Sequence, residues 1–429
     1  MSGLEKGSDA VDHVVTDVDG NEFHITKEIG RGGQGVVYST DDPNLAIKQP
    51  ITKDNRLDTS RDLNEIFENI RRLPMPQGVR VAAPIAILAS EPGYVMQHME
   101  GRRPFEKYDA IDREGYAATG ATKTRLQMLA SAAATLARLH AAGIVYGDIS
   151  SNNIYVDAED PSSVWLIDPD NLSFELDQAD DGVFYTPGYG APELVRGEDG
   201  PRPTTDTWSF AVLAYRLLVM IHPFIGKAVL DEDAEDSWDV SAATSVGDSN
   251  PEQMAYAGLL PFVDDPDDDS NRAEKDGVML GLYREGVLTP ELARLFEEVF
   301  CEGRKNPWRR PSMLDFAVAL QKAADLCVTC PACGMNHFAA GETICPWCDA
   351  KLPRYCVATS PTGWQMVLQG ATNGRYLLPE HMFGPFYPGS FLSSEYEAEL
   401  FASSDTARPV RGTKAFPTGL DFRFFGGSV

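Results

Sequence analysis

The sequence lacks the features of a membrane or secreted protein. It contains no apolar run of about 18 residues, and its first residues, MSGLEKGSDAVDHVV, have neither the basic start nor the apolar stretch of a secretory signal. Basic residues are also scarce, because 37 Lys and Arg stand against 64 Asp and Glu and give a formal net charge of −27. Such an acidic surface repels nucleic-acid phosphates and anionic lipids. We therefore expect a cytoplasmic protein that binds neither nucleic acid nor membrane.

Cysteine is rare outside one short stretch of the chain. Six of the seven cysteines lie between Cys327 and Cys356, which in a reducing compartment favours a metal site over a disulfide framework. Two Cys-Pro-x-Cys turns have the spacing of a closed, structural zinc site, with the predicted ligands Cys330, Cys333, Cys345 and Cys348. A ligand set shifted to include Cys327, or a redox-active pair, is the alternative. The segment resembles a zinc ribbon, and the scarcity of Lys and Arg around it favours a protein-docking or spacer role.

Composition and residue periodicity divide the chain into segments of an α+β protein. In order, they are a flexible polar leader (1–20), a small sheet with one helix (21–100), a mainly helical region (101–325), the cysteine segment (326–352) and a small all-β module (353–429). An acidic insert at 227–276 interrupts the helical region. We interpret this insert as a solvated surface excursion rather than a site for a cation or a basic partner.

The first candidate site is the glycine-rich sequence GRGGQGVV, with Gly30, Gly32 and Gly35. Strand-like residues beginning near Val37 follow it, whereas a dinucleotide-binding fold would continue with a helix. The glycines therefore favour a hairpin whose backbone amides approach phosphates, and an ordinary glycine turn is the alternative.

A lysine follows on the next predicted strand, in the sequence LAIK. The ammonium of Lys48 can hold the α and β phosphates of a nucleotide if a carboxylate from a helix orients it. The next helix offers Glu65 and Glu68. We prefer Glu65, although spacing alone leaves the helix register open.

Two later segments carry the remaining groups that phosphoryl transfer requires. In IVYGDISSNNIYV, Asp148 can accept the proton of an attacking hydroxyl, and Asn153 can hold a metal ion. In VWLIDPDN, Asp168 follows a predicted strand and can bridge a metal ion to the nucleotide phosphates. Single Asp and Asn residues are more often turn residues. The order of glycine loop, Lys, Glu, Asp, Asn and Asp is what favours catalysis.

These motifs resemble the protein kinase family over residues 21–325. YGDISSNN aligns with the catalytic loop, Asp168-Pro169-Asp170 with the metal-binding motif, and TPGYGAPE with the end of the activation segment. The resemblance implies a bilobal fold that binds ATP and Mg²⁺, with Mg²⁺ on Asn153 and Asp168. It also implies an ion pair between Glu193 and Arg310 and a bracing role for Asp206. The nucleotide contacts that it implies are Gly30, Gly32, Gly35, Val37, Ala46, Lys48, the gatekeeper Met96, and the hinge from Gln97 to Met99.

The chain departs from this family in the catalytic and metal-binding motifs. Tyr146 and Gly147 replace the His and Arg of the catalytic loop, so the usual cationic pocket for an activation-loop phosphate lacks its central member. We therefore expect no strict need for phosphorylation at Tyr185 or Thr186. Ser150 stands where Ser/Thr kinases carry a Lys beside the γ-phosphate, which removes a charge from the transition-state clamp. Pro169 and Asp170 replace Phe and Gly, which puts a second carboxylate beside the metal-binding one.

The combination Tyr-Gly-Asp, Asp-Pro-Asp and LLPFVDDPDDDSNR resembles a bacterial subgroup of Ser/Thr kinases from tellurium-resistance-type stress clusters. That resemblance implies two partners, a von Willebrand factor A protein and a metal-dependent Ser/Thr phosphatase. An active Ser/Thr protein kinase is the favoured function. A pseudokinase scaffold, which Gly147, Ser150 and Pro169 favour, and a small-molecule kinase, which TPGYGAPE opposes, are the alternatives.

Overall fold

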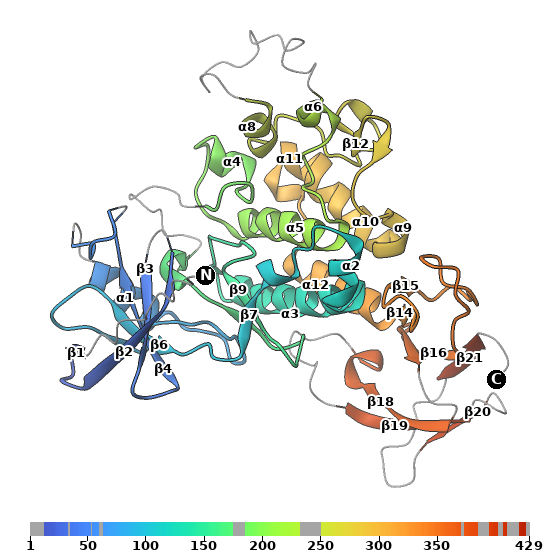
Figure 1. Cartoon of the computed structure of the whole chain (residues 1–429), viewed down its shortest axis with the longest axis horizontal. Helices are drawn as coiled ribbons and strands as arrows, with labels where there is room; N and C mark the ends of the chain where they lie inside the picture. The colour runs from blue at the N-terminus through green and yellow to red at the C-terminus, as the bar shows by residue number, and fades with distance from the viewer. Residues whose placement is uncertain are drawn as a thin grey trace, which may run out of the picture.

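The computed structural model has three parts (Figure 1). A sheet lobe near the N-terminus lies beside a larger helical lobe, and a group of short C-terminal strands lies against the helical lobe. The α+β prediction is therefore confirmed. The structure describes residues 13–32, 35–52, 54–59, 63–174, 185–231, 250–369, 373–384, 394–401, 406–409 and 420–425.

The sheet lobe is a six-stranded antiparallel sheet with the strand order β1-β2-β3-β4-β6-β5. Its strands are β1 (His13–Thr16), β2 (Glu22–Arg31), β3 (Gly35–Thr40), β4 (Leu45–Pro50), β5 (Ala86–Ile87) and β6 (Tyr94–Gln97). One helix, α1 (Leu63–Arg72), belongs to this lobe and buries Leu63, Phe67 and Ile70. Because these residues are three and four positions apart, they share one face of the helix.

Strand β1 corrects the expected extent of the polar leader. Residues 13–16 pair with residues 22–25 of β2 in an antiparallel register, and the side chain of Val15 is buried. Val14 and Val15 are β-branched, and such residues fit a pleated, half-buried edge. Their polar neighbours concealed this short alternation in the sequence. Residues 1–12 of the expected leader lie outside the described residues.

The helical lobe is built around three long helices, α3 (Ala121–Ala141), α5 (Pro203–Val219) and α12 (Met313–Asp325). Helices α3 and α5 are buried along most of their length. Helix α5 is apolar nearly all round, which is typical of a buried helix. The shorter helices are α2 (Arg113–Ala118), α4 (Pro192–Val195), α6 (Lys227–Leu230), α8 (Pro251–Tyr256), α9 (Arg284–Val287), α10 (Pro290–Glu297) and α11 (Gly303–Lys305). Within the described ranges, no helix has the length and apolar character to cross a bilayer.

Short strands connect the helices near the junction of the two lobes. Strands β7 (Arg102–Pro104), β9 (Ile154–Asp157) and β10 (Val164–Leu166) form one small sheet, and β8 (Ile144–Val145) pairs with β11 (Ser173–Phe174). The catalytic-loop residues 146–153 lie between β8 and β9, and Asp168 follows β10. This arrangement brings the two predicted catalytic segments together.

The acidic insert is more closely integrated than a solvated excursion. Phe262 is buried, and its ring centroid lies 5.0 Å from that of Phe300; burying such a ring contributes about 1.5–3 kcal/mol. Asp264 pairs with Arg284 at 2.8 Å, so this carboxylate of the insert has a structural partner. The expectation of a wholly solvated insert is therefore wrong for its later part. Residues 232–249 lie outside the described residues.

The C-terminal part consists of short antiparallel strands. Strands β14 (Cys327–Thr329) and β15 (Asn336–Phe338) pair within the cysteine segment, and β12 (Glu274–Lys275) pairs with β13 (Val278–Met279) in the helical lobe. Two three-stranded sheets follow, formed by β17 (Gln365–Gln369), β16 (Tyr355–Thr359) and β21 (Asp421–Phe425), and by β18 (Asn373–Pro379), β19 (Ser394–Phe401) and β20 (Thr406–Pro409). Apart from a 3-10 turn at Glu380–Met382, the described residues after β15 form no helix. The all-β prediction for this module is confirmed.

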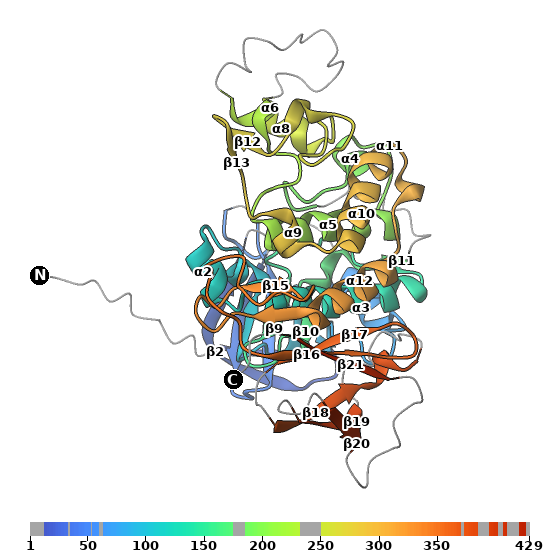
Figure 2. The same ribbon diagram turned by 90° about the vertical axis from the view of Figure 1, so that its right-hand side faces the viewer.

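Polar contacts fasten the C-terminal strands to the helical lobe. Asp325, the last residue of α12, accepts hydrogen bonds from the indole of Trp364 and from His381, both at 2.8 Å. In the cysteine segment, Asn336 accepts from the backbone N–H of Lys123 at the start of α3, at 2.7 Å. Figure 2 shows β16 and β17 next to α12. The strands are therefore a docked part of the molecule.

Candidate active site and metal centre

A cavity of about 780 Å³ lies between the two lobes. Its lining includes most of the residues predicted to bind a nucleotide or to carry chemistry: Gly30, Gly32, Gly35, Val37, Ala46, Lys48, Met96, Met99, Asp148, Asn153 and Asp168. Gln97 and Glu65 are not among the lining residues. The volume and the mixture of apolar and polar groups are typical of a small-molecule site.

Several lining residues were missed by sequence reasoning: Ile29, Arg31, Tyr155, Ile167 and Pro187. Tyr155 had a usable signal, because it lies two positions after Asn153 at the start of a strand, where alternate residues share a face. Ile167 directly precedes Asp168 and could have been included on that ground. Arg31 had no signal of this kind, whereas His98 lies in the predicted hinge from Gln97 to Met99.

The glycine-rich sequence forms a hairpin, as expected. Strands β2 and β3 flank it, and the backbone N–H of Gly32 donates to the carbonyl of Gly35 at 2.9 Å. A Cβ atom at Gly35 would lie 2.9 Å from the side chain of Lys48, which is closer than real Cβ contacts allow. Glycine at this position therefore lets the hairpin lie close to the lysine. Residues 33 and 34 lie outside the described residues.

Lys48 lies within β4, which pairs with β3 on one side and β6 on the other. Its side chain is buried, and its ammonium contacts the carboxylate of Asp168 and that of Asp170, the latter at 2.6 Å. Burial lowers the pKa of the Lys48 ammonium, but the two carboxylates more than offset this effect and the net shift is upward. The lysine therefore stays charged at neutral pH.

The prediction that Glu65 is the partner of Lys48 is wrong, because Lys48 pairs with Asp168 and Asp170. Glu65 lies on an exposed face of α1, and Glu68 pairs with Arg71 at 2.7 Å and with Arg72 at 2.9 Å. The physical reason is the register of α1, whose apolar face points inward. The carboxylates that hold Lys48 in this structure come instead from the segment after β10.

Asp148 accepts hydrogen bonds from two side chains, one in the catalytic loop and one in the TPGYGAPE segment. Asn153 donates to one carboxylate oxygen at 2.9 Å, and the hydroxyl of Thr186 donates to the other at 2.7 Å. Burial raises the pKa of Asp148, the nearby charge of Asp168 raises it further, and the two hydrogen bonds oppose the shift. The carboxylate is thus held in one orientation and made more basic, as a proton acceptor should be.

Tyr146 fills the place of the family's catalytic-loop His. Its hydroxyl donates to the backbone carbonyls of Asn153, at 3.1 Å, and of Ile167. It therefore ties the catalytic loop to the residue before Asp168. Asp206 of α5 accepts from the backbone N–H of Tyr146 at 2.8 Å and from that of Gly147 at 2.9 Å, which is the bracing contact that the resemblance implied.

Gly147 stands where the family has Arg, and its backbone conformation favours glycine. Its φ is +87°, a backbone conformation that glycine adopts readily and other residues rarely adopt. A Cβ atom there would lie 3.0 Å from the carbonyl oxygen of Asn171. The loop is therefore built around a residue without a side chain.

The donor set beside Asp148 is suitable for Mg²⁺. Asn153 uses its amide nitrogen to contact Asp148, so its amide oxygen remains a ligand atom, and Asp168 lines the same cavity. Oxygen ligands from one or two such residues, together with nucleotide phosphates, are what Mg²⁺ prefers. The residues fit the expected ion.

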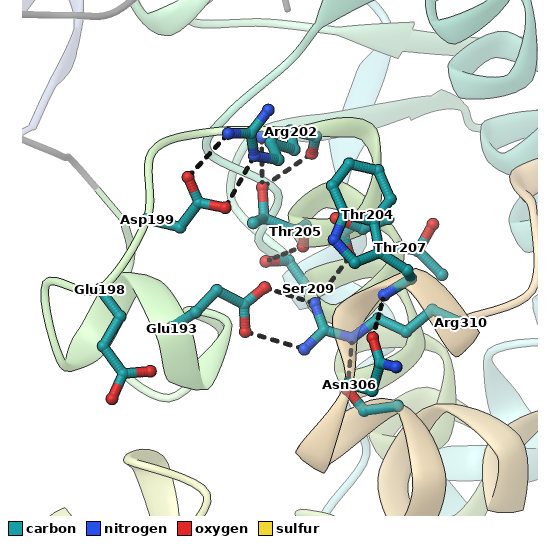
Figure 3. A network of polar contacts seen from close by, with 12 residues as sticks. Glu193, Glu198, Asp199, Arg202, Thr204, Thr205, Thr207, Ser209, Asn306 and Arg310 are labelled. Carbon is teal, nitrogen blue, oxygen red and sulfur yellow. Dashed lines mark hydrogen bonds and ion pairs between the residues drawn. The ribbon is translucent and has the colours of Figure 1, made fainter.

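The predicted pair of Glu193 and Arg310 is present and buried (Figure 3). The Arg310 guanidinium donates to both carboxylate oxygens, at 2.6 and 2.8 Å. It also donates to the backbone carbonyls of Gly303 and Thr204, and its planar group lies 4.9 Å from the ring centre of Trp208. This pair fastens the TPGYGAPE segment to the helical lobe.

The four predicted zinc ligands come together. The sulfur atoms of Cys330, Cys333, Cys345 and Cys348 all lie within 4.8 Å of one another, and the pairs 330–348 and 333–345 are each 3.8 Å apart. Zinc–sulfur bonds of about 2.3 Å in a tetrahedron imply sulfur separations of about 3.8 Å. The geometry therefore fits zinc.

Cys327 lies outside this cluster, so the alternative ligand set that includes Cys327 is not the one the structure brings together. Its side chain is buried and donates to the backbone carbonyl of Ala323 at 3.4 Å. Burial raises the pKa of the Cys327 thiol to about 12. It is therefore a structural thiol at the start of β14, and its sulfur contacts the last turn of α12.

Comparisons with known proteins agree with this site. The protein kinase domain family matches residues 23–315. The similar proteins include the CBL-interacting serine/threonine-protein kinase 16 of Arabidopsis thaliana, 27% identical over 226 residues, or 49% of this chain and 46% of that protein. They also include the serine/threonine-protein kinase PkaB of Streptomyces coelicolor, 26% identical over 220 residues, or 48% of this chain and 51% of that protein.

The curated relatives are matched over part of their length. A putative protein kinase C delta type homolog of Drosophila melanogaster is 37% identical over 95 residues, which is 22% of this chain and 14% of that protein. The chain thus spans about half the length, or less, of these relatives. Because the family match covers most of the chain, and the glycine hairpin, lysine, catalytic loop and ion pair lie where kinases have them, the chain belongs to the protein kinase domain family.

Proposed function

We propose that this chain is a Ser/Thr protein kinase that transfers the γ-phosphate of Mg-ATP to protein hydroxyls. The observation that carries the proposal is the convergence of Lys48, Asp148, Asn153 and Asp168 on one cavity beneath the glycine hairpin. Phosphoryl transfer requires positioning and charge stabilisation more than covalent chemistry by the protein, and these four residues provide both. The Ser/Thr kinases among its relatives support the same activity.

In this proposal the cavity orients the nucleotide from three sides. Val37, Ala46 and Met96 offer an apolar slot for the adenine, and the amides of the glycine hairpin approach the phosphates. The ammonium of Lys48 binds the α and β phosphates. Asn153 and Asp168 hold Mg²⁺, which supplies charge neutralisation for the transferred phosphate.

Asp148 is the proposed proton acceptor for the substrate hydroxyl. Its two hydrogen bonds hold the carboxylate toward the cavity, and its raised pKa improves proton acceptance. Thr186, one of its two donors, lies at the start of TPGYGAPE and matches the Thr typical of Ser/Thr-directed kinases. This contact supports a hydroxyl-bearing protein substrate over a small alcohol.

The proposal is tested by phosphate transfer from labelled Mg-ATP to the full chain itself and to a generic basic protein. We expect label on Ser or Thr, and no label with Asp168→Ala, because that variant loses a metal ligand. Wild-type protein that binds ATP, as seen by a thermal shift, yet labels no acceptor would contradict the kinase activity and favour the scaffold function.

We further propose that catalysis does not strictly require activation-loop phosphorylation. Gly147 carries no guanidinium to receive an activation-loop phosphate, and its backbone conformation excludes one. The chain is treated with a protein phosphatase, which is then removed. Its initial rate of phosphate transfer is expected to stay within about twofold of the untreated rate, a difference of about 0.4 kcal/mol in activation free energy. A lag that ends as the chain phosphorylates itself would contradict this expectation. Mass spectrometry of the treated chain provides the control for complete dephosphorylation.

We propose structural zinc in the cysteine cluster, on the strength of the 3.8 Å sulfur separations. Purified chain is expected to contain one zinc ion per chain by atomic absorption, and Cys345→Ser is expected to lose it, because a closed site requires all four ligands. Cys301→Ser, outside the cluster, is the control and should retain the metal. Equal zinc content in both variants would contradict this ligand set.

The cellular setting and the domain limits are proposed from the sequence resemblance. We place the sheet lobe at 13–100, which adds strand β1 to the expected range of 21–100, the helical lobe at 101–325, the zinc ribbon at 326–352 and the β-rich module at 353–429. We propose a cytoplasmic role in bacterial stress signalling, with a von Willebrand factor A protein and a metal-dependent Ser/Thr phosphatase as partners. The similarity to a Streptomyces kinase supports a bacterial setting, and co-purification from the native host would test the partners.

A further inference from the structure

We propose that Asp170 is the positioning residue for Lys48, in place of a helix carboxylate. This inference rests on the proposed function, because it concerns how the nucleotide-binding lysine is held during the reaction. It assigns a role to a residue that the sequence comparison marked only as a departure from the family pattern. It also replaces Glu65, which was expected to do this work.

Both carboxylate oxygens of Asp170 contact side chains of the sheet lobe. One of its carboxylate oxygens lies 2.6 Å from the ammonium of Lys48, and the other accepts a hydrogen bond from the hydroxyl of Tyr94 at 3.0 Å. Tyr94 is fully buried in β6, directly opposite Lys48 in the antiparallel pair. Both oxygens of Asp170 are therefore used inside the protein, and the lysine and its neighbour are tied to one carboxylate.

The inner side of α1 offers no comparable carboxylate. The ring of Phe67 packs edge-on against Tyr94, with the centroids 4.7 Å apart, so an aromatic pair occupies the space between α1 and Lys48. Glu65 is exposed and Glu68 pairs with arginines of its own helix. Helix α1 therefore contributes no carboxylate to Lys48, and its contact with this network is the packing of Phe67 on Tyr94.

Asp168 and Asp170 both contact Lys48, but they differ in where they lie. Asp168 lines the cavity, whereas Asp170 is not among the lining residues and lies behind the lysine. In the proposed reaction Asp168 would hold Mg²⁺, so its carboxylate would be shared between the ion and Lys48. Asp170 then remains as the counter-ion that aims the ammonium at the phosphates.

The backbone around Asp170 is suited to a fixed role. Residues 169–171 form a 3-10 turn that begins with a buried proline, and the proline ring restricts φ. The carbonyl of Asn171 packs against Gly147 of the catalytic loop. The Asp-Pro-Asp sequence thus places two carboxylates on a stiff turn, one toward the cavity and one toward Lys48.

A double-mutant cycle in Mg-ATP affinity tests this role. Calorimetric titration of ATP in the presence of Mg²⁺ compares the wild type, Asp170→Asn, Lys48→Ala and the double variant. We expect Asp170→Asn to weaken binding on the order of tenfold, which is within the usual range for coupled neighbours. In the Lys48→Ala background the same change should have no further effect, because Asp170 acts through the lysine.

Two further variants separate the possible results. Asp276→Asn, at an exposed turn between β12 and β13, is the matched control for loss of a carboxylate and should bind ATP like the wild type. Tyr94→Phe removes one hydrogen bond to Asp170 and should weaken binding by a smaller factor than Asp170→Asn. In transfer assays, Asp170→Asn should raise KM for ATP more than it lowers kcat.

The inference and the proposed function fail in different ways. Additive effects in the cycle, or a loss of ATP affinity in Glu65→Gln with none in Asp170→Asn, would overturn the role of Asp170 while leaving the kinase intact. A wild type that binds ATP but transfers no phosphate would refute the kinase activity, and the affinity cycle would still decide the role of Asp170. A wild type that binds no ATP would overturn both.

Discussion

Replacing Asp148 by Asn is expected to lower the rate of phosphate transfer by about 10²- to 10⁴-fold, the range usual for loss of a general base. The amide keeps the size of the side chain but cannot accept the proton of the substrate hydroxyl. Asn153 and Thr186 both donate to the carboxylate, so an amide also loses one of these hydrogen bonds. Initial rates with labelled Mg-ATP and a basic protein substrate would measure the effect.

The binding of ATP provides the control for this variant. In the proposed function Asp148 contacts the substrate hydroxyl, whereas Lys48 and the glycine hairpin contact the nucleotide. Calorimetric affinity for Mg-ATP should therefore change by less than about threefold, or 0.65 kcal/mol. A variant that transfers phosphate at more than a tenth of the wild-type rate would show that Asp148 is not the base.

Replacing Arg310 by Met is expected to destabilise the helical lobe by about 3–5 kcal/mol, the usual cost of breaking a buried ion pair from one side. The Arg310 side chain is fully buried, and the Glu193 side chain is 6% exposed. Removal of the guanidinium would leave a buried carboxylate and also the carbonyls of Gly303 and Thr204 without this donor. Urea unfolding followed by tryptophan fluorescence would measure the loss, with Trp208 directly beside the site.

Arg309 provides a matched control in the next position of the chain. Its side chain is exposed, so Arg309→Met should change the unfolding midpoint little. Joint replacement of Glu193 and Arg310 by apolar residues is expected to recover part of the stability, because no lone charge then remains buried. Equal midpoints for Arg310→Met and Arg309→Met would contradict a stabilising role for the pair.

Much of the candidate site was predictable because local sequence carries it. Asp148 and Asn153 are five residues apart in one loop, and the two Cys-Pro-x-Cys turns each present a pair of thiols. Short-range spacing is nearly independent of the rest of the fold. The resemblance to protein kinases then supplied a long-range contact, between Glu193 and Arg310, which the structure contains.

Other features depended on tertiary contacts that spacing does not encode. The sequence DDPDDDSNR did not indicate which part of the insert packs against the core. Asp264 has the same residue type as its solvated neighbours, and only the fold brings Arg284 beside it. Strand β1 was hidden for a similar reason, since Val15 is buried only because β2 provides a partner. In both segments, acidic or polar neighbours in the sequence concealed the residues that pack against the rest of the fold.

By itself, the sequence determined the kinase resemblance, the glycine, lysine, Asp and Asn residues that meet in the cavity and the cysteine ligand set, because each follows from residue type and short spacing or from a motif. Only the tertiary structure decided which carboxylate meets Lys48. The register of α1 turns Glu65 outward, and the stiff turn after β10 directs Asp170 inward over a separation of more than one hundred residues. Helix register and the direction of a distant turn depend on packing of the whole lobe, so no local pattern specifies them.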